Sequence, residues 1–198
     1  MSQATSQTAG RRRTGGRSAR VRQAVLQATV QTVAERGADA VNIAEIARQA
    51  GVHDTSIYRR WPTKEHLIFD SLLDYSVAQL PIPDTGTLRA DLLAFASLIA
   101  SYAATPIGQA LLKAMAVTDD DAALAAGRAQ FWQFRLDQAR AMIDRAITRG
   151  ELRADTDPAL AIELLIAPLH FRLLLSRQPI DERISGQLID LLLNGLAR

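Results

Sequence analysis

The stretch from residue 42 to residue 67 constrains the fold of this chain most strongly, because it predicts two short helices joined by a glycine turn. Apolar residues recur there at three- and four-residue intervals from Ile43 to Ala50, which is the spacing of one helix face. Gly51 suits the left-handed conformation that ends a helix, and Pro62 stops the second helix. Two helices around such a turn are typical of proteins that read the DNA major groove.

Polar and basic residues of this stretch are expected to face outward, because Ile57 and Trp61 are spaced to point inward. The predicted DNA-contacting residues are Asn42, His53, Asp54, Thr55, Ser56, Tyr58, Arg59, Arg60 and Lys64. Thr55 and Arg59 are placed to reach base edges. Lys64 falls in the first turn of the next helix, where free N–H groups favour an anion such as a phosphate.

These residues resemble the signature of the TetR family of transcriptional regulators. The matching blocks are IARQAGV (46–52), SIYRRW (56–61) and PTKE (62–65), with Gly37 closing the preceding helix. The resemblance implies an all-α fold, with an N-terminal three-helix helix-turn-helix DNA-binding domain and a larger C-terminal helical domain for ligand binding and dimerisation. The chain departs from the usual family residues at Ala38, Asn42 and His53. Because His53 is a poor helix cap, Asp54 is the alternative cap, which puts its contact with DNA in question.

Charge is divided unevenly along the chain, although the total is only +2. Residues 1–67 hold eleven Lys and Arg against five Asp and Glu, a net charge of +6, whereas residues 68–198 carry −4. A basic head on an acidic body indicates a polyanionic partner for the head alone. The chain has no cysteine and no hydrophobic N-terminal segment, so we expect a cytoplasmic protein without membrane insertion.

The domain assignment follows from composition and turn signals. Residues 1–17 read as a disordered basic tail, 18–64 as the helix-turn-helix domain, and 65–198 as the ligand-sensing and dimerisation domain. A helix predicted to begin near Ser18 and end at Gly37 braces the head, and the turn from Leu80 to Gly86 separates head from body. The arginines that precede the first acidic residue either solubilise the tail or follow DNA phosphates; they are Arg11, Arg12, Arg13, Arg17, Arg20 and Arg22.

Every later segment has helical periodicity, and none alternates as a strand does. The predicted helices are 87–103, 106–116, one from the acidic residues 119–121 to Arg149 with a break near Gly127, one from Asp157 to Arg177, and 180–196. Asp119, Asp120 and Asp121 fit a helix N-terminus better than a metal site, since no second cluster of oxygen ligands lies near them. No metal or cofactor is expected.

The last two predicted helices suggest a dimer. Residues at four-residue intervals form an apolar stripe, of which Ile184, Leu188 and Leu192 are the predicted interface. The segment before them is apolar nearly all round, whereas a surface helix needs only one apolar face. These helices either cover a second copy in a four-helix seam or lie completely buried within one subunit.

The chain contains no recognisable catalytic set and no phosphate-binding glycine loop, so an enzyme is not expected. An apolar ligand pocket is predicted in the body, walled by Phe95, Tyr102, Met115, Trp132 and His170. Taken alone, a histidine such as His170 is more often a hydrogen-bonded core residue than a ligand-pocket group. The family resemblance implies a homodimeric repressor that binds a palindromic double-stranded operator and is released by an unknown small-molecule effector. The alternatives are an activator and a ligand-binding helical adaptor with a DNA-binding head.

Overall fold

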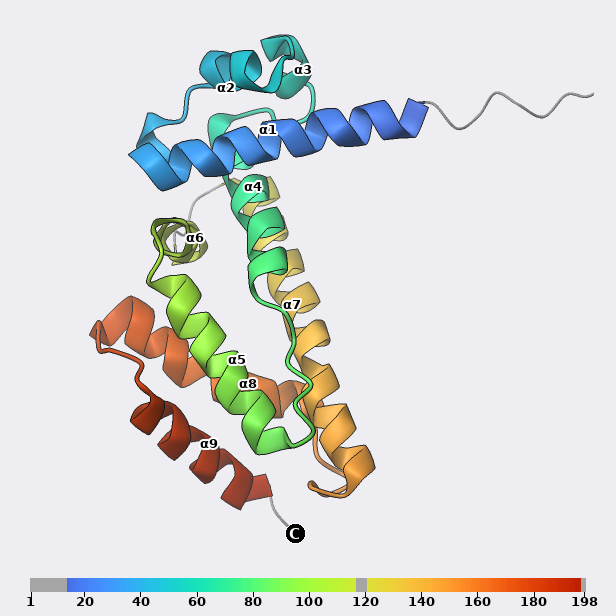
Figure 1. Ribbon diagram of the computed structural model, residues 1–198, viewed down its shortest axis with the longest axis vertical. Coiled ribbons are helices and arrows are strands. Elements are labelled where there is room, and N and C mark those ends of the chain that lie inside the picture. Colours follow the sequence, from blue (N-terminus) through green and yellow to red (C-terminus); the bar gives the residue numbers. More distant parts are fainter. Residues whose placement is uncertain (1–13, 117–120, 197–198) are drawn as a thin grey trace, which may run out of the picture. The chain divides into compact units, whose positions relative to one another are not determined.

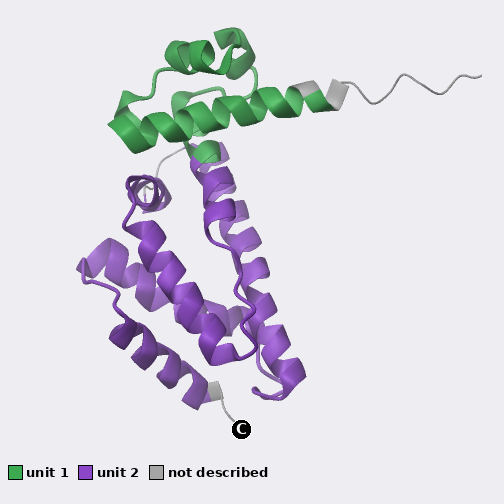
Figure 2. Cartoon of the chain, in the orientation of Figure 1, with its two compact units in different colours: residues 1–71 green, residues 72–198 purple. Residues whose placement is uncertain are grey.

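A computed structural model describes residues 14–116 and 121–196, and in these ranges it contains nine α-helices, one 3₁₀ turn, one π-helical segment and no strand (Figure 1). The prediction of an all-α chain is confirmed. The chain forms two compact units, Met1–Ser71 and Leu72–Arg198 (Figure 2). The division falls inside helix α4 (Lys64–Gln79), later than the predicted boundary after residue 64, because Leu67 at the start of α4 is completely buried in the first unit.

The first unit contains α1 (Thr14–Arg36), the 3₁₀ turn η1 (Ala38–Ala40), α2 (Ile43–Ala50), α3 (Asp54–Tyr58) and the first two turns of α4. Figure 1 shows α2 and α3 on the same side of α1. The helix α1 begins at Thr14, before the predicted start at Ser18. Arg11, Arg12 and Arg13 lie outside the described residues, as does the side chain of Arg17.

The inward face of α1 includes two threonines whose hydroxyl groups need partners when buried. Thr29 donates to the carbonyl oxygen of Val25 at 2.9 Å, and Thr32 donates to that of Ala28 at 3.0 Å. These bonds within one helix satisfy the hydroxyls, so the threonines can pack beside Val33 in the core. These residues form part of the buried face of α1.

The turn between α2 and α3 depends on Gly51, which has φ 66° and ψ 36°. Its left-handed conformation lets the N–H of Val52 reach the carbonyl oxygen of Ala47 at 2.9 Å, which ends α2. A side chain at this position is strained by its backbone angle, although space for a Cβ is open. The predicted role of Gly51 is confirmed.

The second unit contains α5 (Leu88–Ala103), α6 (Pro106–Ala116), α7 (Ala122–Arg149), α8 (Pro158–His170), the π-helix η2 (Phe171–Ser176) and α9 (Glu182–Leu196). Side chains of Thr87, Asp121 and Asp157 accept N–H bonds at the starts of α5, α7 and α8. The predicted break near Gly127 is wrong, since α7 continues through it. Asp119 and Asp120 lie outside the described residues.

The end of α8 also differs from the prediction, which extended one helix to Arg177. Pro168 lacks an N–H and disturbs the regular helical ladder, and the chain adopts a π-helix from Phe171. Arg177 then ends this segment with φ 54°. The helix α9 begins at Glu182, because the carboxylate of Asp181 accepts the N–H of Ile184 at 2.8 Å.

The core of the second unit lies where α5, α7, α8 and α9 meet, since α7 packs on α8 and α9 packs on both α5 and α8. Buried residues from all four helices form one cluster, represented by Leu92, Met142, Ile162 and Ile189. The chain turns by 93° between α5 and α6. Gly108 permits this corner, because a Cβ there would lie 1.9 Å from the carbonyl oxygen of Tyr102.

Candidate nucleic-acid interface and buried cavity

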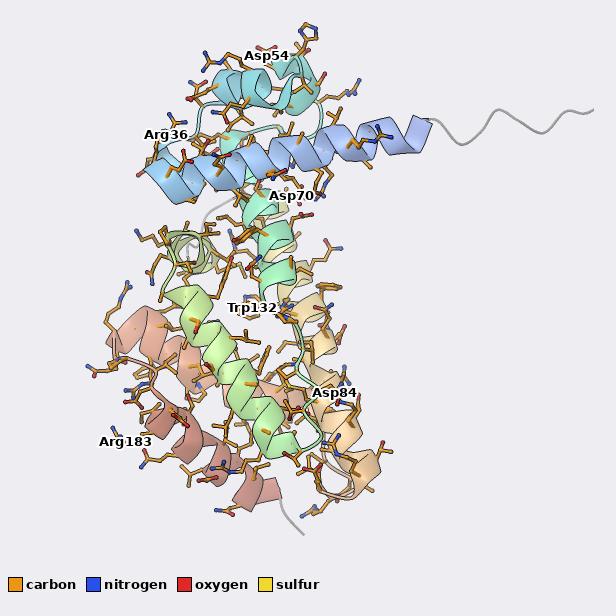
Figure 3. The ribbon with its side chains drawn as sticks, viewed as in Figure 1. Arg36, Asp54, Asp70, Asp84, Trp132 and Arg183 are labelled. Atoms are coloured by element: carbon orange, nitrogen blue, oxygen red, sulfur yellow. The ribbon has the colours of Figure 1, made fainter. Side chains whose placement is uncertain are left out.

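Four of the nine residues predicted to contact DNA are exposed on α3 or at Arg59, which directly follows it. Asp54, Thr55, Tyr58 and Arg59 are exposed, whereas Ile57 between them is 1% exposed and holds the helix to the first unit. Asp54 projects from the start of α3 (Figure 3). A single buried anchor thus presents a short row of polar and basic side chains on one helix.

The remaining predicted contacts flank that row at helix ends. Asn42 caps α2, its side chain accepting the N–H of Glu45 at 3.2 Å. His53 occupies the cap position of α3 without a side-chain bond, and the carboxylate of Asp54 accepts the N–H of Thr55 at 2.7 Å. Asp54 therefore satisfies one N–H at the start of α3 from its first helical position.

Lys64 is the first residue of α4, as expected from the sequence. The hydroxyl of Thr63 accepts the N–H of His66 at 3.3 Å, which makes Thr63 the cap of this helix. The guanidinium carbon of Arg60 lies 5.8 Å from the centre of the Trp61 ring. Cation–π attraction of this kind orients the Arg60 side chain while leaving it exposed.

Asp70 connects several elements of the first unit, and it was not identified from the sequence. Its carboxylate accepts bonds from Trp61 Nε1 at 2.9 Å and from Arg22 Nη2 at 3.0 Å. Asp70 thus joins α1, the end of α3 and α4 in one cluster. The guanidinium of Arg22, one of the arginines before the first acidic residue, is thus paired with Asp70 in the folded unit. The signal in the sequence that could have identified Asp70 is an acidic residue among the apolar residues of α4.

A hollow of about 860 Å³ opens between α1 and α3 in the first unit. Four of the predicted DNA residues, His53, Ser56, Arg59 and Arg60, line it together with Arg22. At the end of α1, the guanidinium of Arg36 donates two hydrogen bonds to the carboxylate of Glu45, the shorter 2.9 Å long. This pairing lowers the pKa of Glu45. The ion pair fixes α2 to the end of α1.

A small cavity of about 70 Å³ lies inside the second unit. All five residues predicted to wall a ligand pocket line it: Phe95, Tyr102, Met115, Trp132 and His170. They come from four helices, and Trp132 lies on the side of α7 that faces α5 (Figure 3). That a ligand binds among them stays a prediction. Arg135, which lines the same cavity, was not among the predicted residues.

Polar groups are few in this cavity. Burial lowers the pKa of His170, although the bond between its Nδ1 and the Ile166 carbonyl oxygen, 3.1 Å long, opposes this shift. A carbonyl oxygen only accepts, so Nδ1 carries the proton of the neutral ring. The His170 ring meets that of Trp132 edge-on, with 5.0 Å between their centres.

The residues of the predicted dimer interface have mixed surroundings. Ile184, Leu188 and Leu192 are half-buried, and Leu188 and Leu192 pack against the core of their own unit. Other large apolar side chains of α8, η2 and α9 are more than half exposed: Leu160, Leu164, Phe171, Leu175 and Leu191. We call these five the exposed apolar face. The sequence pointed to the last two helices as carrying surplus apolar residues, but it did not identify these five exposed side chains.

One apolar segment of the described chain, Pro158–Ser176, is long enough to cross a membrane by length and composition. Four of its residues are buried in the core of the second unit: Ala161, Ile162, Leu165 and Leu169. The described residues contain no group of three or more His, Cys, Asp or Glu that could hold a metal ion.

Comparison with known proteins identifies relatives over nearly the whole chain. Residues 25–70 match the model of bacterial regulatory proteins of the tetR family, and residues 82–192 match the tetracyclin repressor-like C-terminal domain. The HTH-type transcriptional regulator AqdR of Rhodococcus erythropolis is 38% identical, covering 90% of this chain and 86% of that protein. The DNA-binding transcriptional repressor TetR of Mycobacteroides abscessus is 33% identical, covering 84% and 88%.

Solved structures agree with these relatives. The TetR family transcription regulator SCO0332 superposes with a TM-score of 0.80 at 30% identity, covering 90% of this chain and 99% of that one. The regulator FadR from Bacillus subtilis, solved with stearoyl-CoA, has a TM-score of 0.62 at 20% identity, covering 88% and 98%. The latter likeness is one of fold alone.

Proposed function

The chain belongs to the TetR family of bacterial transcriptional regulators, and from this premise we propose that it is a homodimeric repressor. The chain is a DNA-binding helix-turn-helix regulator and not an enzyme. The dimer binds a palindromic operator and leaves it when a small molecule occupies the second unit. A relative described as a repressor supports this direction of control.

The observation that carries the proposal is the exposed row on α3 beside the capped start of α4. Thr55 and Arg59 stand clear of the core, and arginine suits the two acceptors of guanine in the major groove. Lys64 and the free N–H groups of the first turn of α4 suit a backbone phosphate. The proposed base-reading and phosphate-binding groups thus belong to the same unit.

A second copy of the chain is the proposed occupant of the exposed apolar face. Leu164 and Leu191 expose large apolar side chains on α8 and α9, which bury other residues in the core, and Phe171 is exposed at the start of η2. Large apolar side chains left exposed on neighbouring elements favour an interaction site. A two-fold dimer would place two copies of α3 in major-groove segments about 34–36 Å apart, one turn of DNA.

The buried cavity is the proposed effector site. Its lining is apolar with few polar groups, as is usual for small-molecule sites. At about 70 Å³ it is smaller than the roughly 300–1,000 Å³ of such sites, so effector binding must enlarge it. An effector that binds the enlarged form better than the DNA-bound form would shift the protein off its operator. Since its target is chromosomal DNA, we place the protein in the cytoplasm.

Selection of bound duplexes from a random DNA library tests this function. We expect the purified chain to enrich an inverted repeat whose half-sites are one helical turn apart, and to bind it as a dimer. Deleting the gene should raise transcription of the gene beside that repeat. Enrichment of a single unrepeated site would contradict the dimer, and a fall in transcription would identify an activator.

A further inference from the structure

One polar group of the cavity lacks any partner in the described part of the chain. The hydroxyl of Tyr102 is buried and makes no hydrogen bond. Burial raises the pKa of Tyr102, with Tyr75 adding to the shift and Arg135 opposing it. The phenol therefore stays protonated near neutral pH, and its O–H is a donor without an acceptor. Such a group destabilises a folded protein unless something else accepts its hydrogen bond.

Arg135 is a second unusual group, because it is a buried cation bonded only to neutral oxygens. It is 7% exposed; one nitrogen donates to the Leu80 carbonyl oxygen at 2.9 Å and another to Gln138 Oε1 at 3.0 Å. No carboxylate among the described residues forms an ion pair with it. Burial lowers the pKa of Arg135, yet a guanidinium remains charged in a protein. Buried charges are ordinarily paired, so this one favours a negative group nearby.

The cavity can grow in one direction. Leu112, His170 and Leu173 line the cavity and also line a neighbouring groove of about 520 Å³. They therefore stand between the two spaces, and displacing them joins cavity and groove. Leu173 belongs to the π-helix η2, a kind of segment found frequently at functional sites. A ligand much larger than 70 Å³ could extend this way.

We infer that the cavity binds an organic acid as its anion, with the acidic oxygen accepting the Tyr102 hydroxyl beside Arg135 and the apolar body among Phe95, Met115 and Trp132. This inference rests on the proposed effector function and names the chemical class of the effector. The ligand satisfies the unpaired hydroxyl and neutralises the guanidinium in one place. Its apolar body supplies the contacts that displace Leu112 and Leu173.

Two fluorescent probes with the same apolar body test the inference. One is 1-anilinonaphthalene-8-sulfonate, an anion, and the other is N-phenyl-1-naphthylamine, which lacks the sulfonate. Tyr102→Phe removes only the hydroxyl, and Tyr75→Phe makes the same change in a neighbouring ring that does not line the cavity. All measurements use the full-length chain, with circular dichroism as the check of folding.

Tyr102→Phe should weaken binding of the anionic probe roughly 10- to 100-fold, the loss of a hydrogen bond to a charged acceptor. It should leave the neutral probe unchanged, and Tyr75→Phe should change neither. Arg135→Gln should weaken binding of the anionic probe further. If Arg135→Gln fails to fold, Tyr102→Phe alone decides. Equal losses for both probes, an unchanged affinity for the anion, or no binding of the anion to the wild-type chain would overturn the inference.

The same samples report on the proposed function separately. Without a probe, wild-type and Tyr75→Phe proteins should bind the selected operator with equal affinity, since Tyr75 lies outside both the DNA-binding unit and the cavity lining. The anionic probe should release the wild-type protein from the operator at a lower concentration than it releases Tyr102→Phe. Release by the neutral probe alone overturns the acidic class while leaving effector control intact. Absence of operator binding defeats the proposed function, whatever the probes do.

Discussion

Asp70 is a single side chain that links several elements of the unit that carries the proposed DNA-contacting residues. It accepts from Trp61 and Arg22, so three parts of the first unit depend on one carboxylate. Asp70→Ala should lower the free energy of unfolding by about 1–3 kcal/mol, because bonds to a charged acceptor are lost at a partly exposed site. Denaturant unfolding followed by tryptophan fluorescence measures the change.

The matched control for Asp70 is Asp39→Ala, an exposed acid in the same unit without a described side-chain bond. A change within about 0.5 kcal/mol is expected there. Operator affinity should fall with Asp70→Ala and not with Asp39→Ala. Equal stability of the two variants would show that Asp70 does not hold the surface together.

His170 gives the second unit a pH dependence whose sign follows from its surroundings. Burial lowers the pKa of His170 below its ordinary 6.5, so the unfolded chain binds a proton at a pH where the folded chain does not. This contribution to stability is present above pH 6.5 and is lost as the pH falls through the lowered pKa. Melting temperatures between pH 8 and pH 5 should fall less steeply for His170→Phe than for the wild type. Parallel curves would contradict the assignment.

At the scale of elements, the turn at Gly51 sets where α3 points. Gly51→Ala should cost about 1 kcal/mol, because its φ of 66° disfavours an L side chain even though the Cβ meets nothing within 4 Å. Gly186→Ala is the control, since a Cβ in the interior of α9 also meets nothing and alanine favours a helix. Thermal melting should therefore show opposite signs for the two variants. Stabilisation by Gly51→Ala would contradict the strained turn.

Most element boundaries could be predicted, because local signals fix them. Thr87, Gly51 and Gly150 cap or end helices through their own backbone and side-chain chemistry. The continuous α7 could not be predicted, since Gly127 weakens a helix locally while the packing of the helix keeps it intact. The π-helix after Pro168 was equally hidden, because periodicity alone does not tell α from π.

The candidate sites were predictable to different degrees, because some of their residues are set by local sequence and others by tertiary packing. The exposed row on α3 follows from spacing within one short segment. Leu188 and Leu192 illustrate the limit: the apolar stripe of α9 marks the helix, but only tertiary packing decides that part of it covers the core. Asp70 and Arg135 bond to partners far away in sequence, Arg22 and the Leu80 carbonyl oxygen, and the sequence does not identify these partners.

At the scale of the whole molecule, the exposed apolar face predicts how a dimer can be dissociated without unfolding the subunits. Leu164→Glu combined with Leu191→Glu should give monomers in sedimentation, because charges would enter the apolar seam. Both side chains are more than half exposed, so the subunit should keep its melting temperature within a few degrees at most. The paired change Gln27→Glu and Gln130→Glu adds the same charges at exposed polar sites away from α8 and α9 and should leave the dimer intact. A dimeric leucine double variant would contradict this interface.

Reading of DNA by α3 is the central claim, and binding isotherms on the selected operator and on a shuffled duplex at several salt concentrations test it most directly. Lys64→Ala should weaken binding to both duplexes alike, as loss of a phosphate contact does. It should also lower the slope of log affinity against log salt concentration by about one per protomer. Arg59→Ala should cost roughly 1–3 kcal/mol on the operator and nothing on the shuffled duplex. Equal losses on both duplexes for Arg59→Ala would contradict base reading by this residue.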